Sequence, residues 1–351
     1  MQESLIRLLR CPVTNTALSG KFLKWSDKIL DGEKISCIEE GILYATQDWY
    51  YPIIKGIPRL NVEAFIDHED FFKDRAIDHE NLKANLFKKY GALIKEVVRK
   101  NKRTKESFAK EWSVYNYDKD RTWDADNEGM IGRFLKETDE TDESLKDKLI
   151  FDAGCGNGKL DILIAEKDAT VIAMDLTDGF EEAYKRNHSS HVHFIQGDVQ
   201  FPPVAFNSFD IVHCSGVLIH TNNAEFSFLR IEPCVKMNGK LSVWLYHPRK
   251  NMIHNLFNRI RKLTSKLPLN FQYYLYSVTI LPVSYCIKRL KGNKQNPREM
   301  MVDILDWFTP EFRSEHEHAE VEGWFTKRNY KNVRITTTNV FGFNMTGEKY
   351  P

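Results

Sequence analysis

The feature that most constrains the fold of this chain is an alternation of short apolar runs and helical segments between residues 148 and 247. Helical patterns separate most of these runs, and a helix is the usual crossover between parallel strands. The alternation therefore predicts a parallel sheet with helices on both faces. Two later runs predict two more strands, which gives an α/β fold with a seven-stranded, mostly parallel sheet. The predicted strands are LIFDAG, TVIAMDL, VHFIQGD, FDIVHCSG, KLSVWLYH, VRITTTN and FNMTGEKY.

A glycine-rich loop, DAGCGNG at 152–158, follows the first predicted strand. Glycines let a ligand approach the backbone closely, because they have no Cβ and tolerate tight turns. The spacing differs from the dinucleotide pattern G-x-G-x-x-G, since Lys159 stands where its third glycine would be. The absence of a Gly-Lys-Ser/Thr ending excludes a phosphate-binding P-loop. The loop by itself leaves the ligand open.

Acidic residues at the ends of neighbouring strands narrow the range of ligands that the loop could bind. Asp152 precedes Gly154 by two positions, and Asp175 ends the next predicted strand, where a carboxylate can accept both hydroxyl hydrogens of a ribose. Asp198 ends the third predicted strand, where a carboxylate can accept from an adenine amino group. All three lie at the carboxyl ends of parallel strands, which is where ligands bind in open α/β sheets.

These motifs, in this order, resemble those of class I S-adenosylmethionine-dependent methyltransferases. FDAGCGNG resembles the first motif of the family, VIAMDL its ribose-binding strand end, and QGDV with FDIVHCSGVLIHT its adenine and post-adenine motifs. The resemblance implies a Rossmann-like fold and S-adenosyl-L-methionine as cofactor, while a dehydrogenase or a degenerate binding fold remains the alternative. The implied cofactor-binding residues are Asp152, Gly154, Cys155, Gly156, Gly158, Asp175, Leu176, Asp198, Val199 and Ser215.

Within that set, the resemblance gives individual roles. Gly154 and Gly156 would line the methionine and ribose part of the cofactor, and Asp175 would bind the ribose. Leu176 would pack on the adenine, and Asp198 with the backbone of the following residue, Val199, would recognise the edge of the adenine.

Two histidines are the candidate catalytic residues. His220, in GVLIHT, follows the fourth predicted strand and is expected on the methyl side, as a general base or a substrate-orienting group. His247, in LYHPRK, ends the fifth predicted strand beside the same cleft. A structural or capping role remains open for each histidine. Asp306, in DWFTPEF, resembles a segment that covers the substrate entrance in related proteins.

The segment FAKEWSVYNY at 108–117 resembles the one that folds over the cofactor in related methyltransferases. Trp112, Tyr115 and Tyr117 could shield a sulfonium, since aromatic faces attract cations. Ordinary packing remains the alternative for each of them.

The first 62 residues are predicted to form a small separate module. LLRCP and YPIIKGIPRL resemble a zinc-ribbon-like activator subunit of tRNA and translation-factor methyltransferases, whose metal-binding members use four cysteines. Here only Cys11 and Cys37 are present, and Thr14 stands where a CPxC partner would be. Two thiolates cannot close a tetrahedral zinc site, so we predict no metal. Intramolecular support, partner docking and a simple stabilising cap all remain open as its role.

The remaining boundaries follow from composition. Residues 63–147 are predicted as a helical linker and cofactor-covering segment that ends in an acidic linker at 136–147, and 148–248 with 306–351 as the core. Residues 249–305 are a predicted helical lid whose first part, 249–267, holds six Lys and Arg and no acid. Three interpretations of this lid stay open: a substrate lid that can also form a homodimer, peripheral membrane contact through 249–290, and a weaker nucleic-acid patch.

Composition bounds the function. The net charge is +1, so no overall field draws the chain to nucleic acid. Six scattered cysteines without a CxxC pair, and no signal-peptide pattern, predict a cytoplasmic protein. We expect in-line methyl transfer to an oxygen or nitrogen of a small-molecule acceptor, such as a sugar, a quinone or another metabolite. RNA or protein modification is the alternative enzyme hypothesis, although the D/N-P-P-Y/F signature is absent. A cofactor-binding pseudoenzyme that supports a partner is the other hypothesis.

Overall fold

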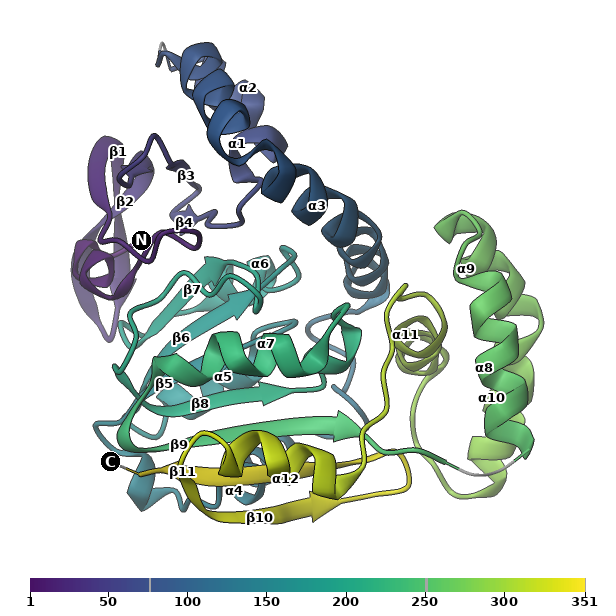
Figure 1. The fold of residues 1–351 in the computed structure, drawn as a ribbon. Coiled ribbons are helices and arrows are strands. Elements are labelled where there is room, and N and C mark those ends of the chain that lie inside the picture. The colour runs from purple at the N-terminus through teal and green to yellow at the C-terminus, as the bar shows by residue number, and fades with distance from the viewer. Residues whose placement is uncertain (76, 250–251, 351) are drawn as a thin grey trace.

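The larger of two sheets has seven strands. It appears at the centre of the computed structural model, which describes residues 1–75, 77–249 and 252–350 (Figure 1). The strands lie in the order β10-β11-β9-β8-β5-β6-β7. Strands β5 to β9 are parallel, and β11 is antiparallel to both β9 and β10. The predicted fold class and all seven predicted strands are confirmed. The strands are β5 (Leu149–Ala153), β6 (Thr170–Asp175), β7 (Val192–Gln196), β8 (Phe209–Ser215), β9 (Val235–Tyr246), β10 (Tyr330–Thr338) and β11 (Gly342–Lys349).

Helices cover both faces of this sheet because its central strands are apolar on both sides. Ile150 packs in a core cluster with Phe134 and Ile164, whereas the next residue, Phe151, packs in the opposite cluster with Phe228. Successive residues of one strand thus pack into the hydrophobic cores on opposite faces of the sheet. The covering helices are α4 (Asn127–Thr138), α5 (Lys159–Ala165) and α6 (Glu181–Arg186) on one face, and α7 (Ala224–Ile231) and α12 (His318–Thr326) on the other.

The N-terminal module contains an antiparallel sheet of β1 (Ser19–Leu30), β2 (Glu33–Tyr44), β3 (Tyr50–Ile54) and β4 (Ile57–Pro58), preceded by a 3-10 helix at Glu3–Leu8. Strand β1 and the first half of β2 form a long hairpin that the sequence analysis does not predict. Its two-residue turn, Asp31-Gly32, has φ values of 49° and 80°, the conformation that Asp-Gly favours. Most of strand β1 faces solvent, and its sequence mixes polar with apolar residues.

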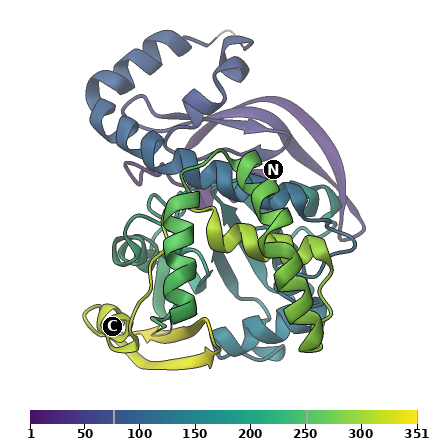
Figure 2. The same ribbon diagram turned by 90° about the vertical axis from the view of Figure 1, so that its right-hand side faces the viewer.

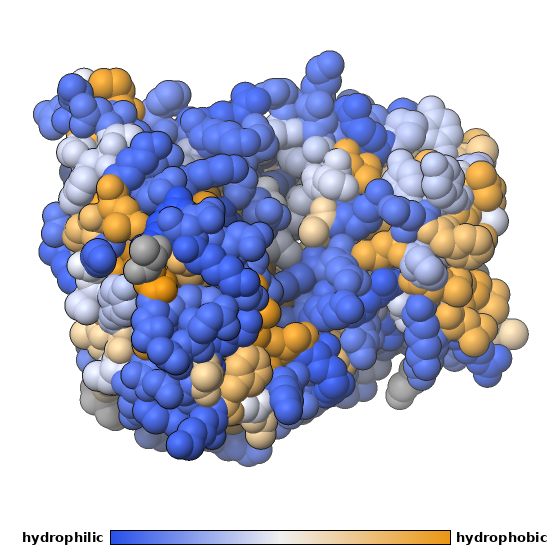
Figure 3. Space-filling view, turned by 90° about the horizontal axis from the view of Figure 1, so that it is seen from above, coloured by the Kyte–Doolittle hydropathy of each residue, from blue (hydrophilic) through white to orange (hydrophobic). Residues whose placement is uncertain are grey.

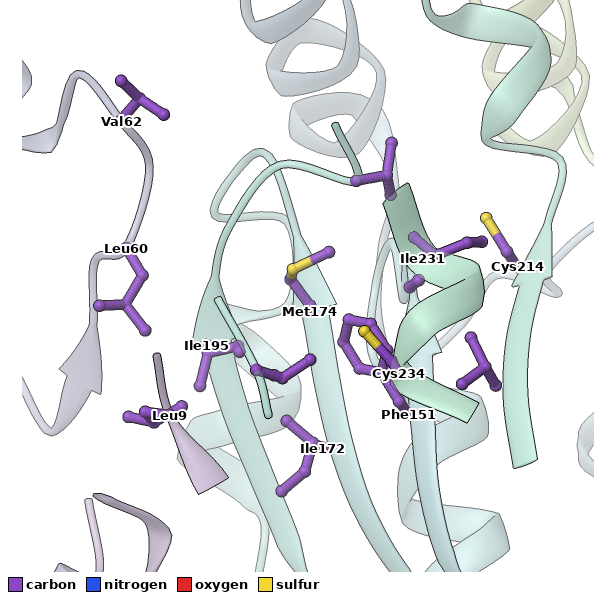
Figure 4. Packing of buried hydrophobic residues seen from close by; sticks show 14 of the residues in the cluster. Leu9, Leu60, Val62, Phe151, Ile172, Met174, Ile195, Cys214, Ile231 and Cys234 are labelled. Carbon is purple, nitrogen blue, oxygen red and sulfur yellow. The ribbon is translucent and has the colours of Figure 1, made fainter. Parts of the chain in front are cut away.

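The module packs against its own core at the β7 edge of the large sheet. The backbone N–H of Leu60 donates to the carbonyl of Gln196 at 2.8 Å, and Arg59 forms a parallel bridge with Gln196. Leu9, Leu60 and Val62 join the hydrophobic core that contains Ile195 (Figure 4). The hypothesis of intramolecular support therefore has a structural basis in these contacts.

Three helices connect the module to the sheet: α1 (Ala64–Asp67), α2 (Glu69–Lys73) and the long α3 (His79–Val114). The following α4 packs on the sheet and includes the start of the segment expected to be an acidic linker. Glu137 in that segment is buried, and so is Leu145 in the 3-10 helix Glu143–Leu145. Residues 136–147 thus include the end of α4 and three buried positions, while most of the segment is exposed.

Four helices follow β9: α8 (Met252–Thr264), α9 (Leu269–Val278), α10 (Ile280–Leu290) and α11 (Pro297–Phe308). Figure 2 shows them in front of the sheet when the molecule is viewed from the lid side. Helix α11 packs against α3, α8, α9 and α10. Residues 250 and 251 of the predicted lid lie outside the described residues. Among the helices described, none combines the length and the apolar character needed to cross a membrane.

Candidate functional site

A large cavity lies at the carboxyl ends of β5, β6 and β8, between the sheet, α3 and helices α8, α10 and α11. Its volume is about 1320 Å³, whereas a drug-sized ligand needs about 300–1,000 Å³. The cavity therefore has room for a cofactor and a second small molecule. From the predicted site set it brings together Asp152, Gly154, Cys155, Gly156, Asp175, Leu176, Asp198, Val199, Ser215 and His220.

The glycine loop needs its glycines for backbone shape and for close packing. Gly154 and Gly156 have φ values of 117° and 57°. A Cβ on Gly156 would come within 2.8 Å of the Trp112 ring, and one on Gly154 within 2.1 Å of Val217. Trp112, at the end of α3, thus covers the loop and also lines the cavity, where we expected it.

Gly158, by contrast, does not line the cavity. It has a φ of 72° at the start of α5, and a Cβ there would approach Phe194 and Ala183 within 2.8 Å. Its glycine allows α5 to pack closely on α6 and β7, so we do not propose ligand contact for it. Tyr115 and Tyr117 also lie outside the lining: Tyr115 donates to the Asp120 carbonyl, and Tyr117 lies beside Lys159.

Asp175, at the end of β6, is fixed by three donors. Its Oδ2 accepts from the Gly156 backbone N–H at 3.0 Å, and its Oδ1 accepts from the backbone N–H and the hydroxyl of Thr177, each at 2.8 Å. Burial raises the pKa of Asp175, and these hydrogen bonds act in the opposite direction. A carboxylate has about four acceptor positions, so one remains for a hydroxyl group in the cavity.

Asp198 is held from a different element. Its Oδ1 accepts from the backbone N–H of Gln200 at 2.8 Å, and its Oδ2 accepts from the Asn101 side chain of α3 at 3.0 Å. Asn101 also donates to Glu63, just after the N-terminal module, at 3.1 Å. Burial raises the pKa of Asp198. The module and α3 therefore meet at this end of the cavity.

Asp152 is part of a buried three-residue chain that the sequence analysis missed. His213 Nδ1 lies 3.0 Å from Asp152 Oδ1, and His213 Nε2 lies 2.9 Å from Glu137 Oε2. Burial acts to lower the pKa of His213, but the two carboxylates raise it to about 10. A charged imidazolium therefore ties α4 and β8 to the start of the glycine loop.

His220 lies in the 3-10 helix Leu218–His220, directly after β8. Its Nδ1 donates to the Phe312 carbonyl at 3.2 Å, so a neutral ring carries its proton there and leaves Nε2 as the basic nitrogen. Nε2 lies 3.4 Å from Asp306 Oδ1, and the Tyr246 hydroxyl donates to Asp306 Oδ2 at 3.0 Å. His220, Asp306 and Tyr246 all line the cavity.

Glu111 is a further cavity residue that the sequence analysis did not identify. It is fully buried, and within the described parts of the chain neither carboxylate oxygen has a hydrogen-bond partner. Burial, together with the charges of Asp306 and Asp303, raises its pKa well above the ordinary range. An uncompensated carboxyl group in a ligand cavity is a candidate functional group.

His247 does not line the cavity. Its Nε2 lies 3.2 Å from the Val340 carbonyl, and its ring contacts His318 at a centroid distance of 6.1 Å. This position agrees with a capping role for His247, and we propose no catalytic role for it.

The cysteines of the N-terminal module are both buried and free. Cys11 Sγ lies 3.2 Å from the Tyr51 hydroxyl. One group of side chains among the described residues, Glu69, His79 and Glu80, has the spacing of metal ligands, but His79 Nδ1 already contacts the Tyr50 hydroxyl at 2.9 Å. The absence of a metal from the function stays a prediction.

Comparisons with known proteins agree with this geometry. Residues 151–243, which span β5 to most of β9, match the family model described as methyltransferase domain. The cavity contains the features that the sequence resemblance implies for binding S-adenosylmethionine: a glycine loop without Cβ atoms, and buried carboxylates on adjacent strand ends. Residues 151–243 are therefore a methyltransferase domain within the Rossmann-like fold of the larger sheet.

Solved structures with a similar arrangement include magnesium protoporphyrin IX methyltransferase (ChlM) from Synechocystis PCC 6803 with bound SAH. It has 16% identity and a TM-score of 0.43, over 73% of this chain and 99% of that one. The 1,6-didemethyltoxoflavin-N1-methyltransferase of Burkholderia thailandensis has 12% identity and a TM-score of 0.38, over 79% and 92%. The YcgJ protein of Bacillus subtilis has 14% identity and a TM-score of 0.37, over 63% and 98%. Comparison with curated proteins gives no match.

Proposed function

We propose that the chain methylates an oxygen or nitrogen of a small-molecule acceptor that binds in the cavity between His220 and the helices after β9. The observation that carries this proposal is the position of the His220–Asp306 pair in the same cavity wall as the predicted cofactor residues. The cavity volume of about 1320 Å³ leaves space for an acceptor beside the cofactor.

In this proposal the cofactor is held by the glycine loop and the strand ends. Gly154 and Gly156 let it approach the backbone, Asp175 accepts from its ribose, and Leu176 and Asp198 contact its adenine. S-adenosylmethionine supplies an already activated methyl group. The task left to the protein is to align the acceptor and to remove its proton where required.

His220 is the proposed proton acceptor. Because Nδ1 is committed to the Phe312 carbonyl, Nε2 can take a proton from an acceptor hydroxyl or amine. The imidazolium that forms would be stabilised by Asp306, which the Tyr246 hydroxyl keeps in place. Asp306 and Tyr246 are thus positioning residues in this proposal.

The walls around His220 indicate the kind of acceptor. Phe108, Trp307, Phe308 and Phe312 line the cavity, and the Phe108 ring meets the His220 ring edge-on at a centroid distance of 5.3 Å. Aromatic walls suit an acceptor with a planar or apolar body, and the acidic groups beside them suit one nucleophilic oxygen or nitrogen on it. Among the acceptors expected from the sequence, a quinone-like ring fits these walls better than a sugar.

The proposal is tested first by cofactor binding and then by transfer of a labelled methyl group. The purified protein is first titrated calorimetrically with S-adenosylhomocysteine, with NAD as control, and only the former should bind. Methyl-labelled S-adenosylmethionine is then incubated with separate low-mass, RNA and protein fractions of cells that contain the enzyme. We expect label in the low-mass fraction, and its loss with His220→Ala. Label in RNA or protein would support the alternative enzyme hypothesis, and binding without transfer to any fraction would support the pseudoenzyme.

A further inference from the structure

Helices α8, α9 and α10 differ from helices that only cover a core, because they bury several polar side chains and expose many apolar ones. In α8, His254 and Arg261 point inward: Arg261 donates to the Pro310 carbonyl at 3.0 Å, and His254 lies 2.7 Å from Glu315. In α9 the two buried residues are Tyr276, which packs with Phe308, and Gln272, which donates to the Leu267 carbonyl at 2.7 Å. Polar side chains thus share the inner contacts with apolar ones, while many apolar side chains are left outside.

The outward side of these helices is correspondingly apolar. Eleven of the 23 exposed large hydrophobic side chains among the described residues lie between 252 and 290. Leu290, Met252 and Leu263 are 89%, 88% and 76% exposed. Figure 3 shows apolar side chains gathered at the right-hand edge of the molecule, where α8–α10 lie in Figure 1. A patch of this kind marks an interaction surface.

The same segment is strongly cationic. Residues 249–298 contain eleven of the 50 Lys and Arg of the chain and none of its 49 Asp and Glu. Arg259, Lys262 and Lys266 are exposed and have no ion-pair partner within the described ranges. A positive surface with exposed Leu, Met and Val beside it has the composition of helices that lie in the interface of an anionic membrane.

We propose that the face formed by α8, α9 and α10, the α8–α10 face, docks on an anionic lipid bilayer. A second copy of the chain is disfavoured as the occupant, because a symmetric dimer would bring two surfaces of the same positive sign together. Nucleic acid is disfavoured because most of the exposed apolar side chains of this face, such as Leu263 and Leu290, are aliphatic and offer no plane for base stacking.

Part of the cavity wall is formed by residues of the α8–α10 face. Phe257 of α8 and Ile287 of α10 line the cavity and are also 38% and 48% exposed. Docking would therefore turn that part of the cavity wall toward the bilayer. An amphiphilic acceptor could then enter without crossing water, a consequence that rests on the proposed function, whereas the docking itself does not.

The experiment is flotation of the full chain with vesicles of phosphatidylcholine alone and of phosphatidylcholine mixed with phosphatidylglycerol. We expect binding to the mixed vesicles only, and weaker binding as salt rises. Two double variants test the face: Leu263→Asp with Leu290→Asp, and Lys262→Glu with Lys266→Glu. Each should lower the partition coefficient roughly tenfold or more. The matched control is Ile29→Asp, which changes an apolar residue that is 58% exposed on β1.

S-adenosylhomocysteine titration of every variant separates docking from folding and from the proposed function, since affinity for this ligand should stay unchanged. Failure to float with the anionic vesicles, or flotation that survives both double variants, would overturn the proposal. So would a dimer in sedimentation that the Leu263 and Leu290 changes dissociate, or RNA binding that the lysine changes abolish.

Discussion

In the wall of the cavity, Nε2 of His220 lies 3.4 Å from Oδ1 of Asp306. The two residues come from opposite sides: His220 follows β8, and Asp306 lies on α11, one of the helices after β9. The helical segment therefore contributes a side chain to the proposed chemistry as well as covering the cavity. If His220 acts as proposed, the activity depends on the position of α11.

The first prediction concerns His220. His220→Ala should lower kcat by about 10²–10⁴-fold, the usual contribution of a general base, with little change in S-adenosylhomocysteine affinity. Asp306→Asn should also lower kcat, because the imidazolium loses its partner. His247→Ala should retain the activity of the wild type, since the His247 ring lies outside the cavity lining. Steady-state kinetics of the three variants test this. Unchanged kcat in His220→Ala would mean that alignment alone suffices.

The strands of the large sheet could be predicted from sequence because their residues are apolar on both faces. Ile150, Phe151, Val171 and Ile172 are all fully buried, and such runs differ plainly from the polar segments beside them. The β1–β2 hairpin escaped prediction because β1 is mostly exposed and has no continuous apolar run. Its Asp-Gly turn at 31–32 was the available signal.

Only those site residues that belong to a sequence motif, such as Asp175 and Asp198, could be predicted from the sequence. Glu111 and Glu137 are single acids in polar segments, and only the packing of α11 on α3 and of α4 on the sheet buries them. His213 gave a weak signal, as a polar residue inside the apolar strand FDIVHCSG. Contacts between side chains on helices and strands that are far apart in the chain cannot be inferred from a single sequence.

The second prediction concerns Asp175. Asp175→Ala should weaken S-adenosylhomocysteine binding by about 1–3 kcal/mol, as expected for the loss of a hydrogen bond to a charged group. The Gly156 backbone N–H also loses its acceptor, so the glycine loop should loosen. Calorimetric titration measures the change. Asp178→Ala is the matched control, because Asp178 is exposed three residues later on the same loop; equal affinities in the two variants would contradict the assignment.

The third prediction is that replacement of Glu111 raises the stability of the protein and lowers its activity. Since burial raises the pKa of this carboxyl group, the folded state disfavours its ionised form at neutral pH. Glu111→Gln removes that cost, so the free energy of unfolding should rise by about 1 kcal/mol or more, while methyl transfer should fall. Denaturant unfolding and kinetics together test this. The control is Glu106→Gln, at an exposed position of the same helix. Loss of stability in Glu111→Gln would show that the carboxylate is compensated.

The fourth prediction concerns support of the cofactor site from α3. Asn101 donates to Asp198 and Glu63 at 3.0 and 3.1 Å. Asn101→Leu leaves two buried carboxylates without this donor, and S-adenosylhomocysteine affinity should fall roughly tenfold, the effect of about 1.4 kcal/mol. Lys102→Leu, at the exposed next position, should bind as the wild type does. Wild-type affinity in the Asn101 variant would separate the N-terminal module from cofactor binding.

The last prediction is a dependence of stability on pH through His213. Its pKa of about 10 in the folded state lies above the value of about 6.5 expected for an unfolded histidine. The imidazolium contribution should therefore be complete below about pH 6.5 and be lost as the pH rises toward 10. In His213→Gln the free energy of unfolding should be lower at neutral pH, because Asp152 and Glu137 lose the cation between them. The same variant should lose less stability than the wild type between pH 7 and 10.

Thermal unfolding at a series of pH values measures this slope. His188→Gln serves as the matched control, because His188 is an exposed histidine, and its slope should equal that of the wild type. A wild-type slope in His213→Gln would mean that the buried histidine is neutral in the folded protein. The Asp152–His213–Glu137 chain would then hold the glycine loop by hydrogen bonds alone, and raising the pH would not loosen it.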